Sequence, residues 1–259
     1  MAYTKLTPRF TSGAQVEKIS HGNGLQGYRL SIPAGGSEQY RLSQLDDYTK
    51  ISRSQFPLQH PVRLRLFAHT SAETIPGTWG FGLWNDPFGL SLGFGGNPFH
   101  LPALPNAAWF FGASQESYLS FQQDKPGHGF LAQSFHSPKF HPLLVPAGLA
   151  LPFWRKTARR LMGKVIHEDG ARLTIDITQW HSYQIDWRED RVSFQVDDRL
   201  VFASHVSPHP PLGLVIWIDN QYAAFTPEGK IGFGVLANSE PAWLEIKDIE
   251  VMRDGIPHY

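Results

Sequence analysis

The chain has 259 residues with 23 basic and 23 acidic side chains, no cysteine, 41% hydrophobic residues and 13% aromatic residues. This composition can fill a folded core, and its balanced charge offers no net field to attract nucleic acid, which we do not expect as a partner. The lack of cysteine excludes disulfide bonds, thiolate zinc sites and cysteine nucleophiles. Because β-sandwiches often reach this length as one unit, we expect a single domain over 1–259.

The first residues show no secretory pattern, because no apolar run follows residues 1–10. No stretch of the sequence has the length and apolar character of a membrane-spanning helix. We therefore expect a cytoplasmic protein, although a signal peptide removed from the chain would leave no trace in it.

Strand-like segments recur along the chain between clusters of Gly, Pro, Asn and Asp. We predict strands at 27–32, 38–42, 62–69, 79–84, 107–113, 118–122, 173–177, 181–187, 191–196, 213–219, 230–235 and 243–252. The alternation of Val192, Phe194 and Val196 with polar residues, after the polar turn at 188–190, indicates a hairpin. The run LGLVIWI at 212–218 indicates a central strand covered on both faces. The pattern predicts an all-β sandwich of two antiparallel sheets.

Residues 149–165 interrupt the strand pattern, because apolar residues such as Phe153 and Leu161 are interspersed with basic ones. We predict one short inserted helix near 150–165, lying over a sheet edge. An active-site lid and contact with an anionic membrane are the alternatives for this basic stretch. The Gly- and Pro-rich residues 89–105 indicate a long loop, a type of segment that often carries function.

Three segments carry a resemblance to a known family. The segment WHSYQIDW at 180–187, followed by 191–201, resembles the WHTYAIEW…FYVDGKLV hairpin of family 16 glycoside hydrolases. The segment WLEIKDIEV at 243–251 is similar to the last strand of that family, and GFGLW at 80–84 resembles its cleft strand WPAFW. The resemblance implies a concanavalin A-like lectin/glucanase jelly roll with a concave ligand face.

The resemblance ends at the catalytic strand. The family reads E-x-D-x-x-E or E-x-D-x-E there, whereas the matching segment at 106–112 reads NAAWFFG and has no carboxylate. Retaining hydrolysis needs two carboxyl groups about 5 Å apart. Glu116, just beyond the segment, supplies only one, so we do not expect ordinary family 16 hydrolysis.

The expected concave face is aromatic. Gly80 and Gly82 alternate with core positions and would leave a flat floor beside Trp84, a geometry that suits stacking against a sugar. Trp109 and Phe111 share one face of the next strand and would give an apolar lining, with packing in the core as the alternative. The expected ligand-binding residues are Trp84, Asp86, Trp109, Phe111, Trp217, Asn220 and Tyr222.

Asp219 is the candidate proton donor, since it shares a face with Trp217 and an apolar environment would raise its pKa. A turn after a buried strand is its alternative role. His128, His136 and His141, with His205 and His209 in another loop, lack the spacing of a zinc motif, so we expect no metal centre. We expect no cofactor, with a structural calcium ion at Asp248 or Asp46–Asp47 left open.

Three main functions and one further enzymatic alternative remain open at this stage. The first is a carbohydrate-binding domain without retaining hydrolysis, and the second is an enzyme that acts on an apolar small molecule in the same cleft. A divergent family 16-like glycosidase is a further enzymatic alternative, and the third reading is a structural or interaction module. The shape of the sheet does not distinguish them, because one fold hosts unrelated functions.

Overall fold

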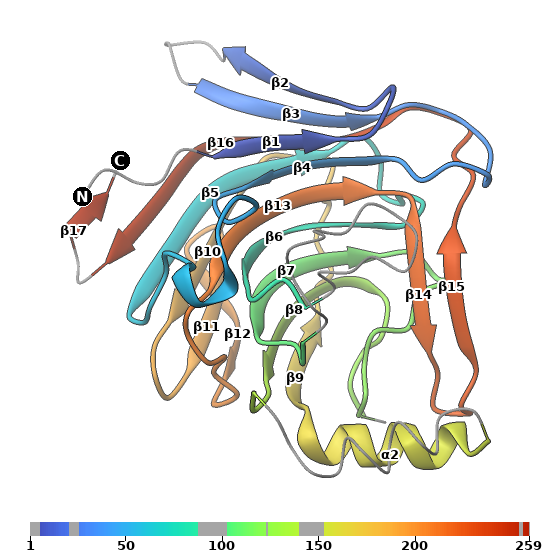
Figure 1. Cartoon of the computed structure of the whole chain (residues 1–259). Helices are drawn as coiled ribbons and strands as arrows, with labels where there is room; N and C mark the ends of the chain where they lie inside the picture. Colours follow the sequence, from blue (N-terminus) through green and yellow to red (C-terminus); the bar gives the residue numbers. More distant parts are fainter. Residues whose placement is uncertain are drawn as a thin grey trace.

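The computed structural model describes residues 6–20, 26–87, 103–122, 124–139, 153–253 and 256–258. In these residues, two large antiparallel sheets pack face to face, and a two-stranded sheet and the helix α2 lie beside them (Figure 1). The predicted all-β sandwich is confirmed.

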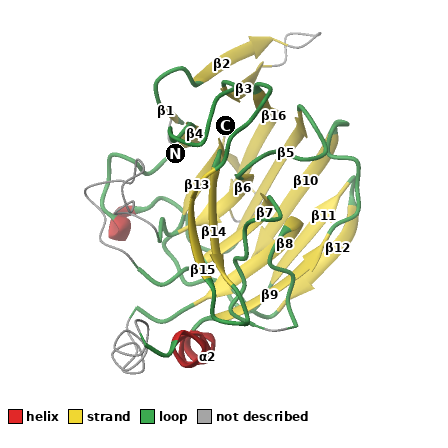
Figure 2. Cartoon of the chain, turned by 90° about the vertical axis from the view of Figure 1, so that its right-hand side faces the viewer, coloured by secondary structure: helices red, strands yellow, loops and turns green. Residues whose placement is uncertain are grey.

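The first sheet, named the concave sheet, curves around the side on which β14, β15 and α2 lie (Figures 1 and 2). Its seven strands stand in the order β1 (Thr7–Phe10), β4 (Leu42–Asp46), β13 (Gly213–Asp219), β6 (Thr78–Trp84), β7 (Ala107–Ala113), β8 (Gly129–His136) and β9 (His167–Arg172).

The second sheet, named the outer sheet, has eight strands. Seven of them stand in the order β12 (Arg199–Ser204), β11 (Val192–Val196), β10 (His181–Trp187), β5 (Val62–Thr70), β16 (Ala242–Arg253), β3 (Gln26–Ile32) and β2 (Gln15–Ser20), and β17 (Ile256–His258) pairs with β16.

The core between the sheets follows from strand alternation. Along β13, Leu214, Ile216 and Ile218 belong to the cluster between the two sheets, whereas Val215 and Trp217 belong to a second apolar cluster on the concave face. Every residue of β13 is buried, as its uninterrupted apolar sequence predicts.

Helix α2 (Arg155–Val165) is the predicted inserted helix, and the two-stranded sheet consists of β14 (Gln221–Phe225) and β15 (Ile231–Val235). A short 3-10 turn, η2, spans Arg53–Gln55. The start of the predicted helical stretch and the predicted loop up to residue 102 lie outside the described residues. Among the described residues, no helix combines the length and apolarity needed to cross a membrane.

Three predicted strands are wrong, and polar contacts explain each. At 38–42, the buried Arg41 donates hydrogen bonds to the carbonyls of Gly35 and Gly36, which holds a turn before β4. At 118–122, Tyr118 makes a single β-bridge to Ala224, and the amides of Phe121 and Gln122 then bind the Glu168 carboxylate, so no strand continues. At 173–177, Asp176 accepts a hydrogen bond from the Thr178 amide and forms a turn. The prediction also missed β1, β2, β8, β9, β12, β14 and β17, and it reached only the first residue of β4.

Candidate functional site

The concave sheet carries a cluster of aromatic rings from four neighbouring strands, β13, β6, β7 and β8. Trp84 on β6 lies 6.0 Å from Trp217 on β13 with nearly parallel rings, and 5.8 Å from Trp109 on β7. Trp109 also stacks on Phe111 at 5.3 Å and meets Phe135 edge-on at 5.8 Å. Four of the predicted ligand-binding residues therefore form one continuous aromatic cluster.

The expected open floor at Gly80 and Gly82 is corrected by the structure. A Cβ on Gly82 would lie 2.6 Å from the Cβ of Trp109, and one on Gly80 would lie 3.0 Å from the ring of Trp217. The missing side chains thus make room for tryptophans of the two adjacent strands. Trp109 and Trp217 are only 5% and 6% exposed.

Trp84 differs from the rest of the cluster because it is partly exposed. Its ring meets Tyr48 edge-on at 6.1 Å, and Tyr48 receives a hydrogen bond from Gln44. Asp86, two residues after β6, is buried in the left-handed backbone region. The open end of the aromatic cluster therefore lies at Trp84.

Asp219 ends β13 in a fully packed polar network. Its carboxylate accepts hydrogen bonds from the hydroxyls of Tyr40 at 3.1 Å and Thr78 at 2.8 Å, and from the amide of Gln221 at 3.2 Å. Thr78 in turn accepts a hydrogen bond from the Trp217 indole at 3.0 Å. Burial raises the pKa of Asp219 to about 6, although these hydrogen bonds oppose the shift.

Asn220, the residue after Asp219, has a structural role. Asn220 is completely buried, accepts a hydrogen bond from the amide of Arg41, and donates to the carbonyls of Gln39 and Leu236. All of these partners of the Asn220 side chain are main-chain groups, so it connects the end of β13 to the segments that contain residues 39–41 and Leu236. Tyr222 lies on β14, where its ring packs over Gly232 and Gly234 of β15.

Besides Asp219, the strands of the concave sheet carry three carboxylates, and none forms a catalytic pair with it. Asp46 stands opposite Val215, four residues along β13, which corresponds to about 13 Å. Glu168 and Asp169 lie on β9, four strands away, at about 19 Å. Two-carboxylate glycoside hydrolysis needs separations between about 5 and 9.5 Å.

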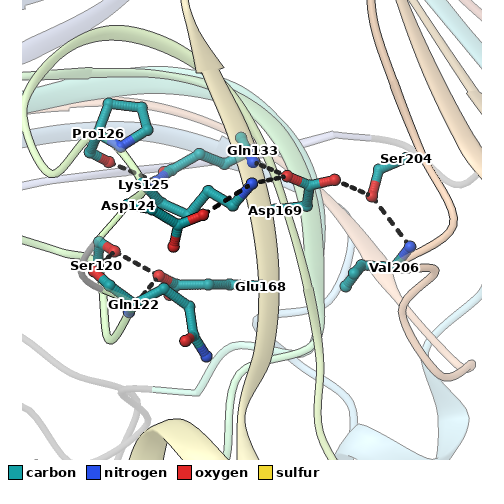
Figure 3. A network of polar contacts seen from close by, with 11 residues as sticks. Ser120, Gln122, Asp124, Lys125, Pro126, Gln133, Glu168, Asp169, Ser204 and Val206 are labelled. Atoms are coloured by element: carbon teal, nitrogen blue, oxygen red, sulfur yellow. Dashed lines mark hydrogen bonds and ion pairs between the residues drawn. The ribbon is translucent and has the colours of Figure 1, made fainter.

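Glu168 and Asp169 point to opposite sides of β9 (Figure 3). Glu168 accepts hydrogen bonds from the Ser120 hydroxyl and from the amide of Gln122 at 2.8 Å. Burial raises the pKa of Glu168, although these hydrogen bonds act in the opposite direction. Asp169 instead pairs with Lys125 at 2.8 Å and binds Ser204, on the other side of the strand.

Three residues of this region were not identified from the sequence: Tyr40 and Thr78, which donate hydrogen bonds to Asp219, and Glu168, which binds two loop amides. Thr78 stands at the start of β6 on the same face as Gly80, so strand alternation could have indicated its place. Tyr40 lies in a turn and Glu168 on an edge strand, and no local pattern places either of them at this sheet.

The histidines do not form a metal centre in the part of the chain that the structure describes, where no three His, Asp or Glu side chains are arranged to hold an ion. The rings of His136 and His209 contact each other at 4.1 Å, and burial lowers the pKa of His209. His205 is exposed, and His141 lies outside the described residues.

The other residues singled out in the sequence, His128, Glu116 and Asp46, lie away from the aromatic cluster or have structural roles. His128 and Glu116 line a cavity of about 540 Å³ together with Trp79 and Phe130 of the sandwich core. Among the calcium candidates, Asp46 accepts the backbone amide of Thr49 at 2.7 Å and thus stabilises a turn.

Comparison with solved structures identifies the architecture. A family 16 glycoside hydrolase of Bacteroides ovatus, solved with a G4G4G3G product, superposes with a TM-score of 0.50 at 10% identity, covering 97% of this chain and 96% of its own. A second Bacteroides ovatus family 16 endo-glucanase gives 0.49 at 11% over the same shares. A glycoside hydrolase family protein of Mycobacterium thermorestibile gives 0.49 at 14%, covering 89% and 77%.

No protein-family model matches the chain, and no curated protein sequence matches it. The structural likeness at these identities concerns the fold. The chain therefore has the jelly-roll sandwich fold seen in family 16 glycoside hydrolases.

Proposed function

We propose that this protein binds a carbohydrate on its concave sheet and does not hydrolyse it by the retaining two-carboxylate mechanism. The aromatic cluster of Trp84, Trp109 and Trp217 is the observation that carries the proposal. Flat indole rings stack against the apolar faces of sugars, and neighbouring polar groups fix the orientation of the ligand. The Bacteroides ovatus enzyme with this fold was solved with an oligosaccharide product, which supports the same ligand class.

Exposure assigns different roles to the rings. Trp84 is partly exposed and is the ring that a sugar would contact. Trp109 and Trp217 are packed behind it and hold its orientation, because their rings lie within 6 Å of it. Tyr48 and Gln44 beside Trp84 are buried and hydrogen-bonded to each other, so they also support the ring from behind.

The proposal that the protein does not use the retaining two-carboxylate mechanism rests on where its carboxylates lie. Strand β7 reads AAWFFGA and contributes aromatic rings in place of acidic side chains. Asp219 lies too far from the other strand carboxylates of this sheet to form a nucleophile and acid pair.

A second candidate function is an enzyme, and Asp219 is the observation that favours it. A carboxyl group with a pKa of about 6 is partly protonated near neutral pH and can serve as a general acid. This candidate covers a divergent glycosidase and an enzyme that acts on an apolar small molecule against the aromatic cluster.

The test combines binding with product analysis. The purified protein is titrated with neutral gluco- and galacto-oligosaccharides while tryptophan fluorescence is followed, and each mixture is analysed for shorter products after one day. Saturable binding without products supports the first function, and products whose formation is abolished by Asp219→Asn support the second. Absence of binding to every sugar, with a response to apolar compounds, would contradict carbohydrate recognition.

A further inference from the structure

Helix α2 presents a strongly basic face. Its 11 residues include five Lys or Arg side chains and no acidic one. Lys156, Arg160 and Lys164 follow one another at spacings of four residues, which places them along one side of the helix, and all three are exposed.

These three side chains line a cavity of about 620 Å³ beside the helix. Phe121, Gln122 and Asp124 form the opposite wall. Gly163 adds no side chain between the walls, and its carbonyl accepts a hydrogen bond from the side-chain Nε2 of Gln122 at 2.9 Å.

A buried arginine holds the walls of this cavity together. Arg159 is 4% exposed and also lines the cavity. Its guanidinium donates hydrogen bonds to the carbonyls of Phe225 at 2.9 Å and Ser120 at 2.7 Å. Glu168 accepts the amides of Phe121 and Gln122 and thereby fixes the opposite wall to β9.

The lining has four cationic groups and one carboxylate, Asp124, which lies 3.7 Å from Lys125. Within the described part of the chain, no carboxylate lies at ion-pair distance from Lys156, Arg160 or Lys164. The Glu228 carboxylate, next to the lining residue Pro227, offsets part of the charge of Lys156. Cations still exceed carboxylates around the cavity, and this excess favours an anionic occupant.

The cavity adjoins the proposed sugar-binding face. Phe121 forms part of the cavity wall, and both Phe121 and Met162 of the helix pack against the apolar cluster on the concave face, which contains Trp109 and Trp217. A chain molecule that lies on the concave sheet could therefore extend into the basic cavity.

We propose that the cavity binds a negatively charged group, a sulfate ester or a carboxylate, carried by the carbohydrate that occupies the concave sheet. Lys156, Arg160 and Lys164 contact the anion, and Arg159 acts as a positioning residue. The carbohydrate part of this assignment rests on the proposed function, whereas the preference for an anion rests on the cavity alone.

The experiment measures the affinity of the full chain for matched neutral and anionic glycans. The pairs are laminarin with sulfated laminarin, which tests a sulfate ester, and cello-oligosaccharides with their C6-oxidised uronate forms, which tests a carboxylate. The variant Lys156→Gln/Arg160→Gln/Lys164→Gln removes the three exposed charges of the cavity. The matched control, Lys18→Gln/Arg188→Gln/Arg191→Gln, removes three exposed charges elsewhere. Circular dichroism confirms that both variants fold.

The wild type is expected to bind the anionic member of at least one pair at least tenfold more tightly than the neutral member in 50 mM salt. The preference should shrink in 500 mM salt, because the exposed cations are screened. The cavity variant loses the preference and keeps its affinity for the neutral glycan, and the control variant retains both.

Equal affinity for the neutral and anionic members of both pairs would overturn the inference and leave the proposed function intact. A preference that survives in the cavity variant would also overturn it. Equally tight binding of single-stranded DNA or of phosphatidylserine-containing vesicles would replace the glycan assignment by general polyanion or lipid binding. Failure to bind any neutral or anionic glycan would overturn both proposals.

Discussion

The indole rings of Trp84 and Trp217 lie 6.0 Å apart and only 6° from parallel, although they come from distant parts of the sequence. The two strands pair so that Gly80 stands opposite Trp217, and the missing side chain at Gly80 leaves space for that ring. The arrangement of tryptophans on this sheet thus depends on glycines as much as on the rings themselves.

Substitution of Gly82 by alanine should therefore destabilise the sheet. The new Cβ would lie 2.4 Å from the carbonyl oxygen of Ala108 and 2.6 Å from the Cα of Trp109, which are backbone atoms that cannot rotate away. We expect a loss of about 1–3 kcal/mol in the free energy of unfolding, measured by urea denaturation. In the control Gly232→Ala, the Cβ meets only side-chain atoms at 3.3 Å or more, so a loss of the same size there would refute this account.

The raised pKa of Asp219 predicts a pH-dependent stability. The folded state holds this proton up to a pKa of about 6, whereas the unfolded chain releases it near 3.8. The folded state thus binds more protons in this window, and stability falls as the pH rises from 4 to 6, by on the order of 3 kcal/mol. Asp219→Asn should lose this part of the pH dependence in urea denaturation at several pH values. An unchanged pH profile in the variant would show that Asp219 is not the group responsible.

Asn220 should matter for stability and not for ligand contact. Asn220→Ala removes the acceptor of the Arg41 amide, the side-chain donor to the Gln39 carbonyl and one of two donors to the Leu236 carbonyl, which we expect to cost about 2–4 kcal/mol in thermal or urea unfolding. Affinity for a glycan, per folded molecule, should stay within twofold of the wild type. A stable variant with weakened binding would instead assign Asn220 to the ligand.

Glu168 should protect the loop that forms one wall of the basic cavity. In Glu168→Ala, the amides of Phe121 and Gln122 lose their acceptor, and we expect their hydrogen exchange to accelerate at least tenfold. Asp169→Asn serves as the control, since Asp169 faces the other side of β9 (Figure 3). Similar exchange in both variants would show that the loop does not depend on Glu168.

Strand alternation was sufficient to predict which side chains share a face. Trp109 with Phe111, and Trp217 with Asp219, lie together as the period of two requires. Alternation says nothing about which strands are neighbours, so the sequence could not show that Gly82 faces Trp109. The same limit explains the expectation of an open floor, which the structure fills with the rings of adjacent strands.

The polar network of Asp219 depends on the same long-range pairing. The raised pKa of Asp219 was expected from its apolar strand, and burial does raise it. Its partner Tyr40 lies in a segment that was predicted as a strand, and a side chain in a turn has no periodicity from which its direction can be inferred. Contacts made by turn residues are fixed only by the complete packing of the chain.

The most direct test of carbohydrate recognition on the concave sheet compares two tryptophan variants. Trp84→Ala removes the partly exposed ring of the aromatic cluster, whereas Trp243→Ala removes a partly exposed ring from β16 of the outer sheet. Both are titrated calorimetrically with the tightest-binding oligosaccharide. We predict at least a tenfold loss of affinity in Trp84→Ala and less than a twofold change in Trp243→Ala. Unchanged affinity in a folded Trp84→Ala variant would contradict a binding site on the concave sheet.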